Sequence, residues 1–199
     1  MTFKIIETFS GIGSQAKALK NIQKINPNFK YSIEATVEWE IGAMYAYDIL
    51  HNGPQDLSKY DNMSKESLVA FLSKYNISSD GKQPLKDKSL SRMSIEKLKS
   101  IKHSIEANKN LVDISKVKVS DLPEADLLTY SFPCQDLSIS SYWHSNFTGI
   151  NKDTPNRSGL LWEIERILNE YEITGKPMPR FLLMENVTAI HGPLHNQNF

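Results

Sequence analysis

The 199-residue chain has a single cysteine, Cys134, and lacks any long apolar run. One thiol excludes an internal disulfide and a metal centre built from several cysteines. Without a run of about 18 apolar residues, the sequence predicts no membrane-spanning helix. The first residues also lack the apolar stretch of a signal peptide. We therefore expect a cytoplasmic protein with no membrane partner.

The chain also lacks an excess of charge of either sign, because 23 Lys and Arg residues balance 23 Asp and Glu residues. Proteins that bind nucleic acid usually carry a surplus of basic side chains for the phosphates. Here the surplus is local, since residues 74–120 hold eleven basic residues against five acidic ones. This segment is either a solvated helical face or a surface that contacts phosphates, and composition alone leaves both open.

What the sequence does contain is the alternation typical of an α/β protein. Its length and its 40% hydrophobic content suit one domain with a sizeable core. Apolar, strand-like runs alternate with amphipathic helical segments, so we predict a doubly wound, mostly parallel α/β sheet whose strand order stays open. The predicted strands are 4–7, 32–37, 126–130 and 180–184, and the predicted helices are 14–25, 41–51 and 159–171.

Residues 54–110 interrupt this alternation. Amphipathic helices are predicted at 64–75 and 94–108, and a polar stretch, 76–91, separates them. We interpret 54–110 as a helical insertion at the periphery of the sheet. At the other end, residues 190–199 show no capping or packing pattern, so we expect a fold that is incomplete at the C-terminus.

A glycine turn follows the first predicted strand. Gly11 and Gly13 precede a predicted helix, and small residues at such a turn let a ligand approach the backbone. Their spacing with Ala16 also fits the dinucleotide fingerprint. Glu38, at the end of the next strand, suits a ribose diol, and Trp39 offers a ring for an adenine. This half of the chain predicts an adenosine-containing cofactor and leaves NAD and S-adenosylmethionine both open.

Cys134 and Glu185 stand where two further predicted strands end. A free thiol is only a few per cent thiolate at neutral pH, so Cys134 would need an electropositive pocket or backbone donors to act as a nucleophile. An inert core cysteine is the alternative. Glu185 follows an apolar strand, so we expect it to be desolvated and able to donate as well as accept a proton. A helix-capping or salt-bridging glutamate is the alternative there.

Three segments, in this order, resemble motifs of the DNA cytosine-5 methyltransferases. Phe-Ser-Gly-Ile-Gly at 9–13, Ser-Phe-Pro-Cys-Gln at 131–135 and Glu-Asn-Val at 185–187 are similar to the first, fourth and sixth motifs of that family. Shorter matches agree with the second, third and fifth motifs; they lie at 38–39, 113–114 and 157–162. The resemblance implies the Rossmann-like fold of S-adenosylmethionine-dependent methyltransferases, in a bacterial or phage enzyme of restriction-modification type.

The resemblance also implies a substrate and a set of roles. S-adenosylmethionine would be the cofactor, and a cytosine flipped out of double-stranded DNA would be the target. Cys134 would add to C6 of this cytosine, Glu185 would bind N3 and the exocyclic amine, and Asn186 would orient Glu185 or the loop backbone. The residues implied in cofactor binding are Phe9, Ser10, Gly11, Ile12, Gly13, Glu38, Trp39, Asp113, Ile114, Pro133 and Leu160.

The loop at 136–156 is polar and contains Tyr142, Trp143, Phe147 and Lys152. It is long enough to close over DNA, and an ordinary surface loop is the alternative interpretation. No metal ligand set is expected.

The chain departs from the family in two respects. Glu7 and Thr8 stand where the family has Asp and Leu, and no match to the late motifs or to a target-recognition region follows. We therefore interpret 1–199 as a partial cofactor-binding and catalytic domain, either truncated or completed by a second chain. Three alternatives stay open: a remnant that binds cofactor without turnover, an NAD-dependent oxidoreductase, and an RNA cytosine methyltransferase.

Overall fold

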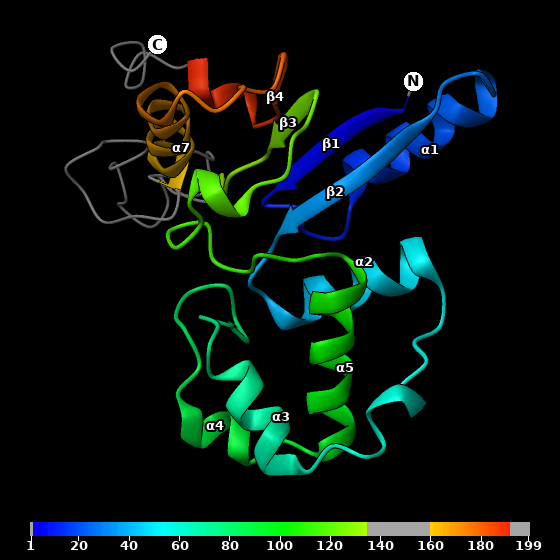
Figure 1. The fold of residues 1–199 in the computed structure, drawn as a ribbon, viewed down its shortest axis with the longest axis vertical. Helices are drawn as coiled ribbons and strands as arrows, with labels where there is room; N and C mark the ends of the chain where they lie inside the picture. The colour runs from blue at the N-terminus through cyan, green and yellow to red at the C-terminus, as the bar shows by residue number, and fades with distance from the viewer. Residues whose placement is uncertain (1, 135–159, 192–199) are drawn as a thin grey trace.

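Figure 1 shows the chain as a computed structural model, which describes residues 2–134 and 160–191. The predicted strands and helices are present, with small shifts at their ends. In chain order the elements are β1 (Phe3–Thr8), α1 (Ser14–Ile25), β2 (Tyr31–Val37), α2 (Ile41–Asn52), η1 (Ser58–Tyr60), α3 (Lys65–Leu72), α4 (Asp87–Ser91), α5 (Ile95–Ala107), η2 (Val119–Asp121), β3 (Leu127–Tyr130), α7 (Leu161–Thr174), β4 (Phe181–Met184) and η4 (Thr188–His191).

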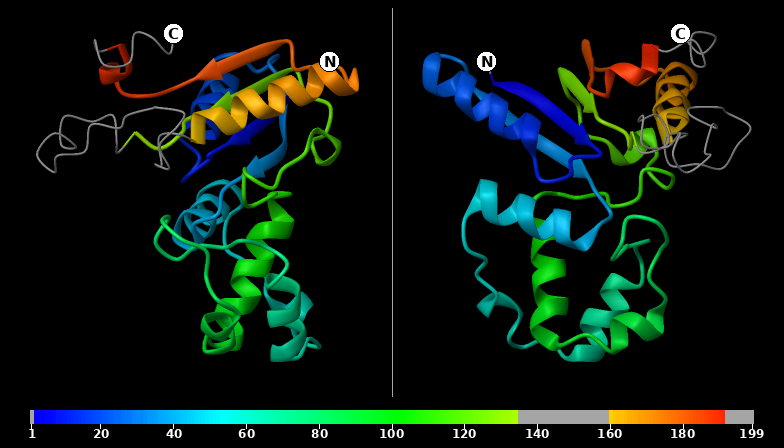
Figure 2. Two further views of the ribbon diagram at one scale, coloured as in Figure 1. Left: turned by 90° about the vertical axis from the view of Figure 1, so that its left-hand side faces the viewer. Right: turned by 180° about the vertical axis from the view of Figure 1, so that it is seen from behind.

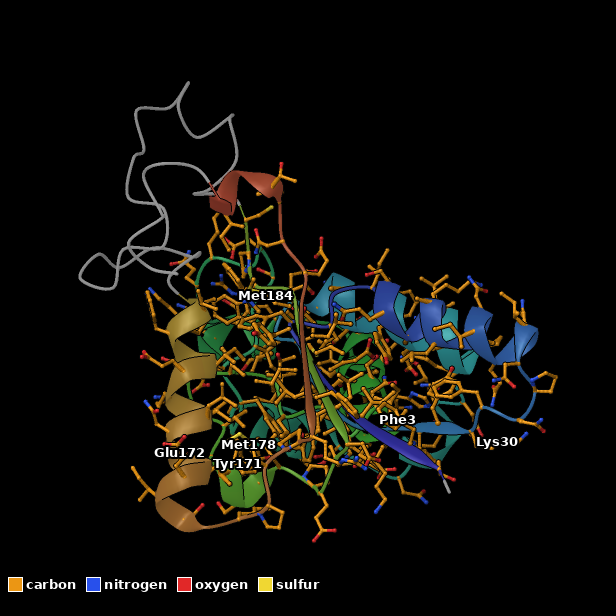
Figure 3. The ribbon with its side chains drawn as sticks, turned by 90° about the horizontal axis from the view of Figure 1, so that it is seen from above. Phe3, Lys30, Tyr171, Glu172, Met178 and Met184 are labelled. Atoms are coloured by element: carbon orange, nitrogen blue, oxygen red, sulfur yellow. The ribbon has the colours of Figure 1, made fainter. Side chains whose placement is uncertain are left out.

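The four strands form one parallel sheet in the order β2-β1-β3-β4. Its helices lie on both faces, with α7 on one side and α1 on the other (Figure 3). This is the doubly wound α/β arrangement that the alternation predicts. Parallel strands end at a common edge, so the segments that follow β1, β2, β3 and β4 are brought together there.

The core beside α7 explains why the sheet and this helix pack. Ile6 and Leu128 are completely buried, and they contact a stripe of α7 that includes Ile164, Ile167 and Tyr171. The spacing of this stripe places its side chains on one helical face. Burial of each such side chain contributes roughly 1.5–3 kcal/mol to folding, so the stripe fixes α7 against the sheet.

Apolar residues of two elements are less buried than their sequence pattern suggests. The apolar stripe of α1 is buried only in its first half, since Leu19 is buried whereas Ile25 is 86% exposed. The strand before Glu185 is not a buried one either. Phe181, Leu182 and Leu183 are all exposed because β4 lies at the end of the strand order and, within residues 2–134 and 160–191, pairs with β3 alone.

Helices α3, α4 and α5 lie apart from the sheet, beyond the ends of β1 and β2, with α2 next to them (Figures 1 and 2). They share a second buried core, to which α2 contributes Met44. The sequence did not predict α4, which lies in the polar stretch, and α3 ends at Leu72, earlier than expected. The division of the chain at 54–110 stays a prediction.

Part of the basic surplus in this region is structural. Lys99 is buried and its ammonium lies 2.7 Å from Asp61 Oδ1. Lys102 is buried as well; it pairs with Glu106 and lies over the ring of Phe71, with its nitrogen 3.6 Å from the ring centre. These two lysines are therefore part of the helical packing and not of a free phosphate-contacting face.

Across the described ranges, no helix has the length and apolar character needed to cross a membrane.

Candidate active site

A cavity of about 770 Å³ lies at the common edge where the strands end. Its lining joins segments that are far apart in the sequence, and it includes every site residue expected from the sequence except Gly13. From those expected residues it gathers Phe9, Ser10, Gly11, Ile12, Glu38, Trp39, Asp113, Ile114, Pro133, Cys134, Leu160, Glu185 and Asn186. The roles of these residues stay predictions, but their convergence on one cavity is a property of the fold.

Gly13, the second glycine of the turn, is not among the residues that line the cavity, and it has a steric reason to be glycine. Its φ of 81° and ψ of 44° are left-handed, a conformation that glycine adopts without strain. A Cβ atom at this position would lie 2.2 Å from His51 Nε2 and 2.7 Å from Tyr47 Cε2. Gly13 therefore lets the start of α1 approach α2, whereas Gly11 lines the cavity itself.

Glu7 lies beneath the same turn and is completely buried. Its Oε2 accepts a hydrogen bond from the Tyr47 hydroxyl at 2.5 Å, whereas no side chain or backbone group in the described part of the chain bonds to its Oε1. Burial raises the pKa of this carboxyl above the ordinary glutamate value, although the Tyr47 bond opposes the effect. Glu7 therefore favours the protonated form more strongly in the folded protein than in the unfolded chain.

Glu38 connects the glycine turn to the end of β2. Its Oε2 accepts a hydrogen bond from the Gly11 amide at 2.9 Å, and its Oε1 accepts one from the Glu40 amide at 2.8 Å. Loss of solvation raises the pKa of Glu38, and the amide donors oppose this. Each carboxylate oxygen keeps a second lone pair, so Glu38 can still accept a hydrogen bond from a ligand in the cavity.

Both carboxylate oxygens of Asp113 accept hydrogen bonds. Its Oδ1 accepts hydrogen bonds from the Ser115 amide at 2.9 Å and the Ser115 hydroxyl at 2.8 Å. Its Oδ2 accepts one from Asn76 Nδ2 at 2.7 Å. The residue before it, Val112, is buried with a φ of 67°, which is a strained value for a β-branched residue. Such strain is kept where the surrounding structure imposes it, often at functional sites.

Cys134 and Glu185 line the same cavity from the segments after β3 and β4. Asn186 joins these segments, because its Nδ2 donates a hydrogen bond to the Phe132 carbonyl at 2.9 Å. The Glu185 amide in turn donates to the Tyr130 carbonyl at 3.1 Å. Cys134 is only half-buried, which is not the inert core position of the alternative interpretation. Glu185 is exposed, so the expected desolvation of this residue is wrong.

Several residues at the site are not evident from sequence patterns. Gln15 of α1 donates to Ser131 Oγ at 3.3 Å and accepts from Thr129 Oγ1 at 3.1 Å, which ties the glycine turn to the Cys134 segment. Asn76 and Asp80 line the cavity from the loop after α3. No motif marks any of them, because tertiary packing and not the local sequence brings Gln15 to the Cys134 segment and the other two to the cavity.

Other predictions from the sequence concern Gln135 and the loop at 136–156, which includes Tyr142, Trp143, Phe147 and Lys152. These residues lie outside the described part of the structure.

The fold and the cavity define an α/β protein with a ligand site at the carboxyl edge of a parallel sheet. The family model of the C-5 cytosine-specific DNA methylases matches residues 85–199, more than half of the chain. The chain therefore belongs to the C-5 cytosine-specific DNA methylase family.

Relatives support this assignment over nearly all of the chain. This chain is 36% identical to the orphan methyltransferase M.SssI of Spiroplasma monobiae, over 98% of this chain and 48% of the relative. It is 32% identical to the type II methyltransferase M2.ScrFI of Lactococcus lactis subsp. cremoris, over 98% of this chain and 50% of the relative. The chain thus spans about half the length of these relatives.

Among solved structures, this chain is similar to the crystal structure of the S. pombe Dnmt2 methyltransferase. The match covers 98% of this chain and 40% of the Dnmt2 chain, with a TM-score of 0.49 and 16% sequence identity.

Proposed function

We propose that this chain is the cofactor-binding and catalytic part of a DNA cytosine-5 methyltransferase that uses S-adenosylmethionine. The observation that carries the proposal is the convergence of Cys134 and Glu185 on one cavity. Asn186 links the segments that hold them, because its Nδ2 donates a hydrogen bond to the Phe132 carbonyl at 2.9 Å. Cys134 and Glu185 are the pair of groups that addition to a pyrimidine ring requires, one nucleophile and one acid.

The cavity suits an adenosine-containing cofactor. Its volume of about 770 Å³ lies within the usual range for small-molecule sites, about 300–1,000 Å³. Glu38 would accept hydrogen bonds from the ribose hydroxyls, Trp39 would pack on the adenine, and Asp113 would accept from the adenine amine. When bound, the cofactor supplies the activated methyl group. Family membership favours S-adenosylmethionine over NAD for this site.

The chemistry of the chain's own residues follows from the groups at the cavity. The Cys134 thiolate adds to C6 of a cytosine flipped out of the duplex, which forms an S–C bond and makes C5 nucleophilic. Glu185 donates to N3 and binds the exocyclic amine, so charge that develops on the ring is neutralised where it forms. After C5 takes the methyl group, a water molecule accepts the C5 proton, the C6–S bond breaks as the C5–C6 double bond re-forms, and N3 returns its proton to Glu185; Cys134 leaves as the thiolate. Asn186 positions the two segments relative to each other.

Recognition of the DNA target is not assigned to any described residue. We propose that protein outside residues 1–199 supplies it, in the same polypeptide or in a second chain, and that the enzyme acts on double-stranded DNA in the cytoplasm. We propose a restriction-modification or phage setting; the name of one relative, a type II methyltransferase, supports the first of these.

A methyl-transfer assay tests the proposed function. The chain, alone and together with the polypeptide that supplies target recognition, is incubated with duplex DNA and radiolabelled S-adenosylmethionine. Label should enter the DNA with the wild-type protein and should be lost with Cys134→Ser. Ser73→Ala, an exposed position at the end of α3, serves as the matched control and should keep full activity.

Methylation that persists in Cys134→Ser would refute the assigned nucleophile. Labelling of tRNA in place of duplex DNA would favour the RNA alternative. Tighter calorimetric binding of NAD than of S-adenosylhomocysteine would refute the cofactor assignment.

A further inference from the structure

Helices α3, α4 and α5 are called the helical cluster below. The loop between α3 and α4 extends from this cluster to the cavity. Asn76, Asp80, Gly81 and Pro84 all line the cavity, although the rest of α3, α4 and α5 lies away from the sheet (Figure 1). We define residues 76–84 as the wall loop. Neither the family motifs nor the proposed chemistry uses it.

We propose that the wall loop forms the adenine end of the cofactor cavity, and that Asn76 is the positioning residue that orients the Asp113 carboxylate toward the adenine amine. The inference rests on the proposed function, because it takes an adenosine-containing cofactor to bind between Trp39 and Asp113. It gives the helical cluster a role in cofactor selection.

The first observation is the contact between Asn76 and Asp113. The amide of Asn76 lies 2.7 Å from Oδ2, on the side of the carboxylate opposite to Ser115. A carboxylate with a donor on each oxygen cannot turn freely about its Cβ–Cγ bond. Its remaining lone pair, on Oδ2, is therefore fixed in direction. Without Asn76, only the Ser115 side of Asp113 would stay bonded.

The second observation is that the wall loop also fixes the backbone at Trp39. The Ser78 amide donates to the Trp39 carbonyl at 2.8 Å, and the Ile41 amide donates to the Ser78 carbonyl at 2.9 Å. Ser78 is fully buried, and its hydroxyl accepts from the Gly81 amide at 3.0 Å and donates to the Gln83 carbonyl at 2.8 Å. The loop therefore contacts both residues that are proposed to bind the adenine.

The third observation is that the wall loop is anchored in the helical core. Ile77 is 1% exposed and belongs to the buried cluster of α3, α4 and α5. The Leu85 amide closes the loop by donating to the Ile77 carbonyl at 2.7 Å. Because one side chain of the loop is buried in the helices and the next backbone groups bind Trp39, the helical cluster sets the position of the cavity wall.

The arrangement predicts selectivity for the base. An ionised carboxylate only accepts hydrogen bonds, so a fixed Asp113 favours adenine, which presents an amine, over hypoxanthine, which presents a carbonyl oxygen at the same position. A site built for a donor penalises a ligand that lacks it, because polar groups are then left unpaired. This selectivity should depend on Asn76.

Calorimetry with S-adenosylhomocysteine and its hypoxanthine analogue, S-inosylhomocysteine, tests the proposal on the chain itself. For Asn76→Ala we expect binding of S-adenosylhomocysteine to weaken about tenfold, the loss of one hydrogen bond to a charged group. Binding of the hypoxanthine analogue should change little, so the preference for adenine should also fall about tenfold. Asn28→Ala, at an exposed loop position, is the matched control and should leave both affinities unchanged.

Thermal unfolding of each variant separates positioning from stability. Should Asn76→Ala fail to unfold cooperatively, Ser115→Ala applies the same test to the other carboxylate oxygen, with a smaller expected loss because the Ser115 amide remains. An unchanged preference for adenine in a folded Asn76→Ala protein would overturn the inference and leave the proposed function standing. An equal loss for both ligands would show a merely structural role and overturn it too. If the wild-type chain binds neither ligand, the proposed function itself fails.

Discussion

Substitution of Gly13 by alanine tests how the glycine turn is packed. The residue has left-handed backbone angles, and an added Cβ would meet Tyr47 Cε2 at 2.7 Å and His51 Nε2 at 2.2 Å. Tyr47 cannot move aside at low cost, since it is buried and its hydroxyl is bonded to Glu7 at 2.5 Å. His51 could move only by giving up its contact with the Ile12 carbonyl at 3.1 Å.

The size of the effect follows from two contributions. A left-handed alanine costs about 1–2 kcal/mol relative to glycine. Overpacking against fixed side chains costs about 1–3 kcal/mol more. Gly13→Ala should therefore lower the free energy of unfolding by about 2–5 kcal/mol. Gly175→Ala is the matched control, because Gly175 is also left-handed, with φ 67° and ψ 11°, and a Cβ there meets no atom of the described residues within 4 Å.

Urea unfolding followed by circular dichroism measures both variants, with the slope of the transition compared to confirm that the denatured states are alike. Gly13→Ala should lose about 1–3 kcal/mol more than Gly175→Ala, which is the overpacking contribution alone. Equal losses in the two variants would refute the packing argument. They would mean that Gly13 is required only for its backbone angles.

Two further predictions concern the carboxyl beneath the turn and the link between the catalytic segments. Because burial raises the pKa of Glu7, the folded state binds its proton more tightly, and its contribution to stability declines as the pH rises from the unfolded pKa to the folded one. The urea midpoint of Glu7→Gln should therefore rise relative to that of the wild type as the pH increases from acid to neutral. A difference between the two midpoints that does not change with pH would contradict this prediction. Asn186→Ala breaks the 2.9 Å bond to Phe132, so methyl transfer should fall about tenfold or more while calorimetric affinity for S-adenosylhomocysteine is kept; a loss confined to that affinity would contradict the assigned role.

The sequence predicted the sheet well because its strands are short apolar runs bounded by clear turn residues. The end of each strand also marked the site, since parallel strands finish at one edge whatever their order. That is why Glu38 and Cys134, which are 96 positions apart by their numbers, could both be placed at the cavity from local patterns alone.

What the sequence could not show depends on tertiary neighbours. The exposure of Glu185 follows from the place of β4 at the end of the strand order, which no local pattern encodes. The position of Asn76 opposite Asp113 follows from packing of the helical cluster, and a lone asparagine in a polar stretch gives no signal of it. The exposure of Ile25, the last residue of α1, likewise could not be predicted from the spacing of apolar residues along the helix.

Covalent trapping tests most directly the central claim, which is that Cys134 adds to the target cytosine. Duplex DNA that carries 5-fluorocytosine at the target should stop the reaction after methyl transfer, because fluorine cannot leave C5 as the proton does. With S-adenosylmethionine and the complete enzyme present, mass spectrometry of the digested complex should find the DNA adduct on the peptide that contains Cys134. DNA methylation without an adduct on Cys134, or with an adduct on another residue, would contradict the account.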